Sequence, residues 1–159
     1  GLSGEIKTKR QLALNAIHVE QKLIRENVGS QDQTAAAFGG FNRIEFGGSN
    51  EITVYPVTIG QKKLSDLQDH LLMFFTGFSR TASEVAAEQI RLVPQKSNEL
   101  NTMKQMVYEA QNILHNKNKN LNDFGKLLHE SWQLKRSLSS KISNSAIDKI
   151  YDTGRKAGA

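Results

Sequence analysis

Two carboxylates, Glu20 and Asp32, are the side chains in this sequence best suited to do chemistry. A helix over residues 12–27, turning by about 100° per residue, gathers its apolar side chains on one arc, and Glu20 falls near the middle of that arc. A buried ionised carboxylate is costly unless a metal, a proton or a basic group compensates it. Glu20 is therefore predicted to be either a metal ligand or the acidic half of a buried ion pair with a Lys or Arg.

Asp32 is expected in the first turn of a second, short, Ala-rich helix. Val28-Gly29 is predicted to end the first helix, and Ser30 with Gln33 matches the capping box S/T-x-x-E/Q that opens the next one. The exposed N–H groups and the dipole of a helix N-terminus favour an ionised aspartate. By itself Asp32 is an ordinary first-turn acid. Paired with Glu20, it predicts a site that holds a metal and activates a hydroxyl group.

The residues around this pair resemble a known family. Glu20, followed by the string VGSQDQTAAAFGGFNRIEF at residues 28–46, is similar to the central region of the GHMP-type small-molecule kinases. The string is most similar to one branch, the bacterial D-glycero-D-manno-heptose 7-phosphate kinases. Segments 71–84, 124–152 and 154–159 fit the same branch, so the resemblance covers nearly the whole chain.

The resemblance implies an ATP-dependent sugar-phosphate kinase, or a fragment of one. The reaction would transfer the γ-phosphoryl group to the anomeric hydroxyl of D-glycero-D-manno-heptose 7-phosphate. In this family pattern Asp32 orients or deprotonates the acceptor hydroxyl, and Glu20 binds the Mg²⁺ of Mg-ATP. Alternatives are a kinase for another sugar or a mevalonate-type acceptor, and a non-catalytic binding or interaction fragment.

The same resemblance implies substrate-binding residues in two places. Gln31 and Gln33 flank the family aspartate, and the branch places Ser79 and Arg80 near the acceptor sugar. A planar guanidinium suits phosphate oxygens, which makes Arg80 a candidate sugar-phosphate contact. The alternative for Arg80 is a surface arginine near a helix N-terminus.

One family motif does not occur in this sequence. GHMP kinases carry a Gly-Ser-rich loop before the glutamate-bearing helix, and its backbone N–H groups cradle the ATP phosphates. Because that loop is absent, no nucleotide-binding residue can be assigned here. We expect the chain to be the middle portion of a longer kinase, truncated before the family's final glycine motif.

Composition narrows the class of protein. The 159 residues contain no cysteine, which excludes a disulfide framework and a cysteine metal site, and the four histidines have no zinc spacing. No membrane-length apolar run or export signal is visible, so the cytoplasm is expected. The net charge of +5 favours anionic partners, namely a nucleotide and a sugar phosphate. The basic residues are mixed with acids and match no nucleic-acid motif, so no nucleic-acid partner is predicted; a homodimer is possible.

The periodicity predicts an α+β fold, and the resemblance implies that this fold is of GHMP-kinase type. A partial N-terminal β/α portion, residues 1–69, should be followed by a mostly helical C-terminal portion, residues 70–159. A hairpin is expected from strands over 41–46 and 51–59, with Pro56 at an edge or interruption. A short helix over 64–70, a fully apolar strand over 71–76, and helices over 82–92, 97–116, 121–136 and 144–157 should follow, the last of them capped at Asn144. Trp132 is expected to pack in the core rather than stack on a base.

Overall fold

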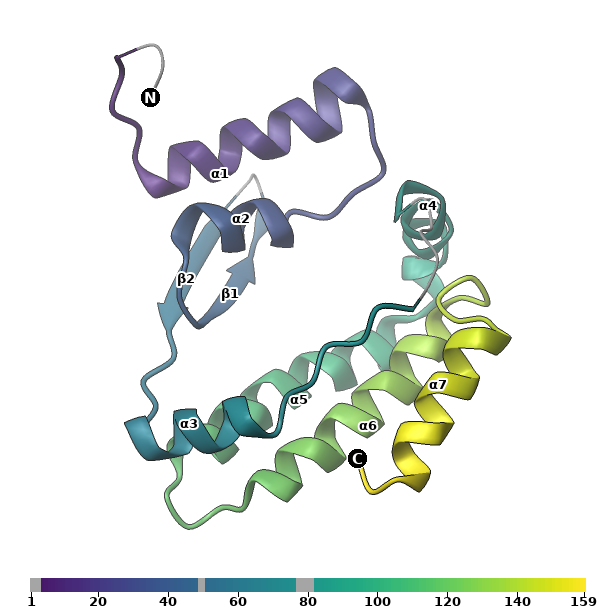
Figure 1. Cartoon of the computed structure of the whole chain (residues 1–159). Coiled ribbons are helices and arrows are strands. Elements are labelled where there is room, and N and C mark those ends of the chain that lie inside the picture. The colour runs from purple at the N-terminus through teal and green to yellow at the C-terminus, as the bar shows by residue number, and fades with distance from the viewer. Residues whose placement is uncertain (1–3, 49–50, 77–81) are drawn as a thin grey trace. The chain divides into compact units, whose positions relative to one another are not determined.

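The computed structural model describes residues 4–48, 51–76 and 82–159, which form two compact units (Figure 1). Unit 1 comprises residues 1–57 and 82–86, and unit 2 comprises residues 58–81 and 87–159. Unit 1 holds α1 (Lys9–His18), the π-helix η1 (Val19–Ile24), α2 (Gln31–Phe38), β1 (Asn42–Phe46) and β2 (Ile52–Pro56). Unit 2 holds α3 (Gln61–Asp69), the 3₁₀ turn η3 (Val93–Gln95), α5 (Ser97–His115), α6 (Leu121–Leu138) and α7 (Ser145–Lys156), and α4 (Ala82–Leu92) is divided between the units. The described chain is thus mostly helical with one small sheet, as expected for an α+β fragment.

In unit 1, α1 packs on α2. A capping box opens α1, because Thr8 Oγ1 accepts a hydrogen bond from the Gln11 N–H and the Gln11 side chain accepts one from the Thr8 N–H. Ala13 of α1 and Thr34 of α2 are completely buried. The Lys9 ammonium donates to the carbonyl of Phe38 at 2.7 Å, which places a cation at the C-terminus of α2, where the helix dipole favours it.

The continuation of α1 departs from the predicted regular helix. Residues Val19–Ile24 form a π-helix, whose i→i+5 hydrogen bonds turn each residue by less than an α-helix does. Leu23 and Ile24 consequently leave the predicted apolar arc and are 66% and 59% exposed. The helix ends at Arg25, which adopts φ of +62°, and not at Val28-Gly29. The prediction of one continuous apolar arc through residue 24 was wrong because it assumed the α-helical period.

The hairpin was predicted correctly. Strands β1 and β2 pair antiparallel, with Ile44 opposite Val54. Pro56 is the last residue of β2, at the end of the ladder, where its missing N–H removes no central hydrogen bond. Across the strands, the Arg43 guanidinium lies 4.3 Å from the centre of the Tyr55 ring.

The helical half also follows the prediction closely, because its apolar residues recur with the helical period. In unit 2, α5 and α6 pack side by side, with Ile113 and Leu138 buried (Figure 1). Trp132 of α6 packs against Tyr151 of α7 at a ring-centre distance of 5.8 Å, which fits the predicted packing role, although Trp132 is half-buried and not in the buried core. Asn144 caps α7 by accepting a hydrogen bond from the Ile147 N–H, as predicted.

The predicted strand over residues 71–76 does not form. These residues follow α3 without regular secondary structure, and among the described residues no strand pairs with them. Met73 is fully exposed and Phe75 is 87% exposed. Apolar composition predicts that a segment is buried, but a strand also requires a hydrogen-bonded neighbour.

No helix in the described part of the chain has the length and apolarity needed to span a membrane.

Lys63 ties α3 to the loop that joins α5 and α6. Its ammonium donates to three backbone carbonyls, those of Ile113, Asn116 and Lys119, at 2.5, 2.6 and 3.1 Å. The contacts join residues 50 to 56 positions apart in the sequence, and their acceptors are carbonyls at the end of α5 and in the loop that follows it.

Replacing Lys63 with methionine should destabilise unit 2. The substitution keeps much of the apolar stem but leaves three carbonyls without their charged donor, so we expect the free energy of unfolding to fall by about 1–3 kcal/mol. Urea unfolding of the intact protein measures this. The matched control is Lys62→Met, because the exposed Lys62 side chain makes no hydrogen bond or ion pair within the described chain. Equal midpoints for the two variants would contradict the proposed tie.

A second contact holds the same loop: Lys119 Nζ lies 2.5 Å from Glu109 Oε1 of α5. The hydrogen bond from Lys119 lowers the pKa of Glu109 below its ordinary value of 4.5, against a smaller opposing effect of desolvation. Because the pKa is lowered in the folded state, the stabilisation is present above pH 4.5 and is lost as the pH falls through the lower, folded-state pKa.

Glu109→Gln should therefore remove part of the acid dependence of stability. We expect the variant and the unmodified protein to differ in urea midpoint at pH 7, and the difference to shrink as the pH is lowered below 4.5. Glu130→Gln, at an exposed glutamate of α6, is the control and should retain the unmodified acid profile. A Glu109→Gln difference that stays constant from pH 7 to pH 3 would refute the assignment.

Candidate functional site

The fold brings Glu20 and Asp32 together. Both line one hollow of about 510 Å³ in unit 1, with Glu20 contributed by η1 and Asp32 by the first turn of α2. Gln33 lines the same hollow, and the remaining lining residues are Leu12, Ala16, Ala36 and Ala37. The small alanines leave space between the helices, so the Ala-rich run that follows Asp32 also shapes the site.

Glu20 is half-buried, not fully buried as predicted, and it lies in a π-helix, where the α-helical period used for the prediction does not hold. Its Oε2 accepts a hydrogen bond from Gln33 Nε2 at 2.5 Å. Across residues 4–48, 51–76 and 82–159, Glu20 forms no ion pair, so the alternative of a buried salt bridge finds no partner there. A partly desolvated carboxylate held by one neutral amide still has lone pairs available for a cation.

Gln33 takes a different role from the one its capping-box position predicts. The Ser30 side chain makes no cap hydrogen bond to α2, and the Gln33 amide is turned toward Glu20. Gln33 is 8% exposed, and its Oε1 is buried without a hydrogen-bond partner in the structure. A buried amide oxygen without a partner is costly, so this atom would be stabilised by a hydrogen-bond donor or a cation.

Gln21 is a positioning residue that the sequence did not reveal. Its Nε2 donates to the carbonyl of Val28 at 3.0 Å and lies 3.4 Å from both the Gly29 carbonyl and Ser30 Oγ. These contacts fix the turn that leads into α2 and so place Asp32. The signal was weak, since a glutamine seven residues before a turn has no distinctive pattern.

The other predicted site residues differ in their outcome. Asp32 lies in the first turn of α2, as expected; it is exposed and lines the hollow. Gln31 begins α2 but is exposed and does not line the hollow. Ser79 and Arg80 lie outside the described residues.

The oxygen atoms of this hollow suit a hard cation such as Mg²⁺. Glu20 and Asp32 offer carboxylate oxygens, and Gln33 offers an unsatisfied amide oxygen. The described residues contain no group of three or more His, Cys, Asp or Glu side chains that could hold a metal by themselves. Mg²⁺ commonly takes one or two carboxylates and completes its shell with substrate phosphates and water. The donor set therefore fits Mg²⁺ shared with a phosphorylated ligand.

Two curated proteins are similar to this chain, whereas no protein-family model matches it. The D-glycero-alpha-D-manno-heptose 7-phosphate kinase of Campylobacter jejuni is 30% identical over 154 residues, which cover 94% of this chain and 44% of the kinase. The bifunctional fucokinase/GDP-fucose pyrophosphorylase of Arabidopsis thaliana is 26% identical over 140 residues, covering 84% of this chain and 13% of that protein. The chain thus spans less than half the length of either relative. Both relatives have sugar-kinase names, which confirms the resemblance to GHMP-type kinases and fits a partial match.

Proposed function

We propose that this chain forms the magnesium- and acceptor-binding portion of an ATP-dependent sugar-phosphate kinase with the GHMP kinase fold. The proposal rests on one observation: Glu20 and Asp32, twelve residues apart, line a single hollow that Gln33, whose buried Oε1 is unsatisfied, also lines. The similarity to two proteins named as sugar kinases supports it.

Asp32 would act on the acceptor hydroxyl. Phosphoryl transfer requires positioning and charge stabilisation more than covalent help from the protein. A carboxylate within hydrogen-bond reach of the hydroxyl orients its oxygen toward the phosphorus and takes its proton as the new bond forms. The first turn of α2 suits this role, because it places the Asp32 carboxylate on the lining of the hollow.

Glu20 and the Gln33 amide oxygen would hold Mg²⁺ together with the phosphates of ATP. The bound ion supplies charge neutralisation for the phosphate oxygens. Gln33 contributes in a second way, since its N–H group fixes the orientation of the Glu20 carboxylate. Gln21 supports the same site by holding the turn before Asp32.

For the acceptor we propose D-glycero-D-manno-heptose 7-phosphate, phosphorylated at the anomeric hydroxyl. The relative matched over 94% of this chain is named as a heptose 7-phosphate kinase. The net charge of +5 also suits two phosphorylated substrates. Gln31, Gln33, Ser79 and Arg80 remain the proposed substrate contacts. The phosphate of the acceptor is the natural partner of the Arg80 guanidinium.

ADP release by the intact protein tests the proposal. The assay supplies Mg-ATP with D-glycero-D-manno-heptose 7-phosphate, and parallel reactions supply fucose, galactose and mevalonate. We expect turnover with the heptose phosphate. Turnover with one of the other acceptors would replace the proposed substrate within the kinase class. No acceptor-dependent ADP release in any reaction would favour a non-catalytic binding fragment.

A further inference from the structure

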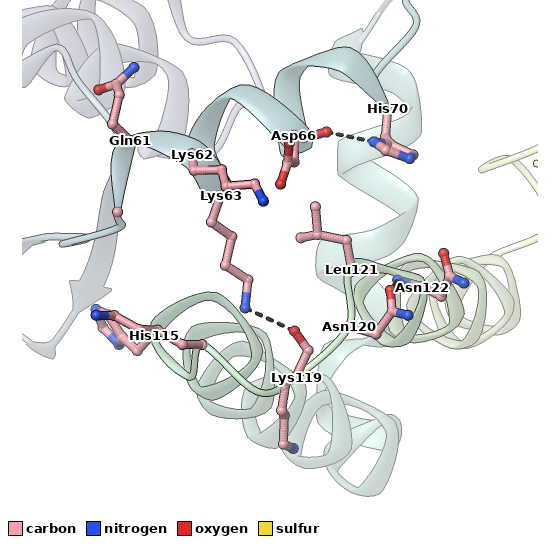
Figure 2. Close-up of a pocket in the computed structure, with 12 residues that line it drawn as sticks. Gln61, Lys62, Lys63, Asp66, His70, His115, Lys119, Asn120, Leu121 and Asn122 are labelled. Atoms are coloured by element: carbon pink, nitrogen blue, oxygen red, sulfur yellow. Dashed lines mark hydrogen bonds between the residues drawn. The ribbon is translucent and has the colours of Figure 1, made fainter.

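A second hollow, of about 630 Å³, lies in unit 2 between the start of α3 and the loop that joins α5 to α6 (Figure 2). It shares no residue with the hollow that contains Glu20 and Asp32. Nothing in the proposed kinase chemistry uses it.

Basic side chains dominate this hollow. Six of its twelve lining residues are basic, and the only acidic one is Asp66. The basic residues are Lys62, Lys63, Lys117, Lys119, His70 and His115. Four lysines against one aspartate give the hollow a positive potential, which favours an anionic occupant.

Two of the four lysines are already engaged. Lys63 donates to three backbone carbonyls, and Lys119 pairs with Glu109. Figure 2 shows Lys63 reaching from α3 to the carbonyl of Lys119. The side chains of Lys62 and Lys117 make no hydrogen bond or ion pair with any described residue. These two ammonium groups are therefore available to a ligand, one from each side of the hollow.

The start of α3 adds backbone donors at the same rim. Gly60 is the N-cap of α3 and has no side chain to accept from the first-turn N–H groups. At the opposite rim, by contrast, Asn120 caps α6 by accepting from the Asn122 N–H. The uncapped N–H groups next to Lys62 strengthen the preference for an anion that the two lysines establish.

We propose that this hollow binds a small molecule carrying two or more phosphate charges, held between Lys62 and Lys117. Lysine ammonium groups are compact, mobile charges suited to phosphate oxygens. The volume falls within the range of small-molecule sites, about 300–1,000 Å³. The lining has one large apolar side chain, Leu121, and no Phe, Tyr or Trp. It therefore lacks the aromatic side chains on which the bases of a single-stranded nucleic acid stack. It also lacks the apolar pockets that anchor a peptide.

The test is pyrophosphate binding to the intact protein at fixed ionic strength, followed by the NMR signals of the histidine rings. His70 and His115 line the hollow, whereas His18 and His129 lie elsewhere and serve as internal controls. His→Gln variants assign the signals. We expect saturable shifts of the His70 and His115 rings with the other two unchanged. Equal shifts of all four rings, or none at the first two, would overturn the site.

A pair of double variants separates a local site from general charge attraction. Lys62→Gln with Lys117→Gln should weaken pyrophosphate binding by at least about tenfold, because both available ammonium groups are lost. Lys104→Gln with Lys149→Gln removes the same charge from exposed positions outside the hollow and should leave affinity nearly unchanged. Neither pair alters the Lys63 contacts that hold the loop, and urea unfolding verifies this. Equal weakening by the two pairs would refute the proposal.

Two further ligands define the chemical class. Inorganic phosphate should bind more weakly than pyrophosphate, since it offers the two ammonium groups less charge and fewer oxygens. Equal affinity would refute the requirement for two or more phosphate charges. A short single-stranded oligonucleotide that shifts His70 and His115 at lower concentration than pyrophosphate would identify the hollow as a nucleic-acid contact and overturn the small-molecule assignment.

Discussion

Replacing Asp32 with asparagine in the intact protein is expected to lower kcat for sugar-phosphate phosphorylation by roughly 10²- to 10⁴-fold. Asparagine has nearly the same shape, but it cannot accept the proton of the acceptor hydroxyl. Because Asp32 is exposed where it lines the hollow, the substitution should not disturb folding, and a loss of this size would reflect the chemistry. Nucleotide affinity, measured by calorimetry, should stay nearly unchanged, since no contact to ATP is assigned to this residue.

The matched control is Asp123→Asn, which also removes a first-turn helix acid, in this case from α6. Its turnover should equal that of the unmodified protein. If Asp32→Asn kept full turnover, Asp32 would be an ordinary first-turn acid, and the proposed acceptor site would have to be sought elsewhere.

Replacing Glu20 with glutamine should raise the Mg²⁺ concentration needed for half-maximal turnover by about tenfold or more. The variant loses the charged ligand, yet its amide oxygen can still accept the hydrogen bond from Gln33, so we expect the fold to persist. Activity measured against Mg²⁺ at constant ATP separates this effect from a general loss of turnover. Unfolding in urea reports stability independently.

Glu26→Gln provides the comparison, since Glu26 is an exposed glutamate that follows the π-helix and does not line the hollow. Its Mg²⁺ dependence should match that of the unmodified protein. An unchanged Mg²⁺ dependence in Glu20→Gln would instead assign Glu20 to structural support of Gln33.

Local patterns predicted most of the elements. The helices α4 to α7 follow from apolar residues at the helical period, and the hairpin follows from two short strands flanking a glycine-rich turn. The pairing of Glu20 with Asp32 was also predictable, because helix–turn–helix spacing brings the end of one helix near the start of the next.

The errors arose where a non-local choice decided the structure. At Glu20, the i→i+5 hydrogen bond of a π-helix is close in energy to the i→i+4 bond of an α-helix. Tertiary packing chooses between them, and the local sequence pattern does not show that packing. The Gln33 amide had two possible partners. Its oxygen could accept from the Ser30 N–H in a capping box, or its N–H group could donate to Glu20, and the hydrogen bond to the charged carboxylate is the stronger one. The predicted strand over 71–76 did not form because no neighbouring strand pairs with it among the described residues. The presence of a neighbour cannot be read from the local sequence pattern.

Leu71 to Phe75 form five consecutive large apolar residues with no charge and no proline, and all five are exposed. Such a segment has the signature of a cross-β nucleus, in which identical chains stack in register. Self-association through this segment therefore competes with the monomeric state, and its rate rises with protein concentration. We therefore expect dilute conditions to favour the folded monomer over association through this segment.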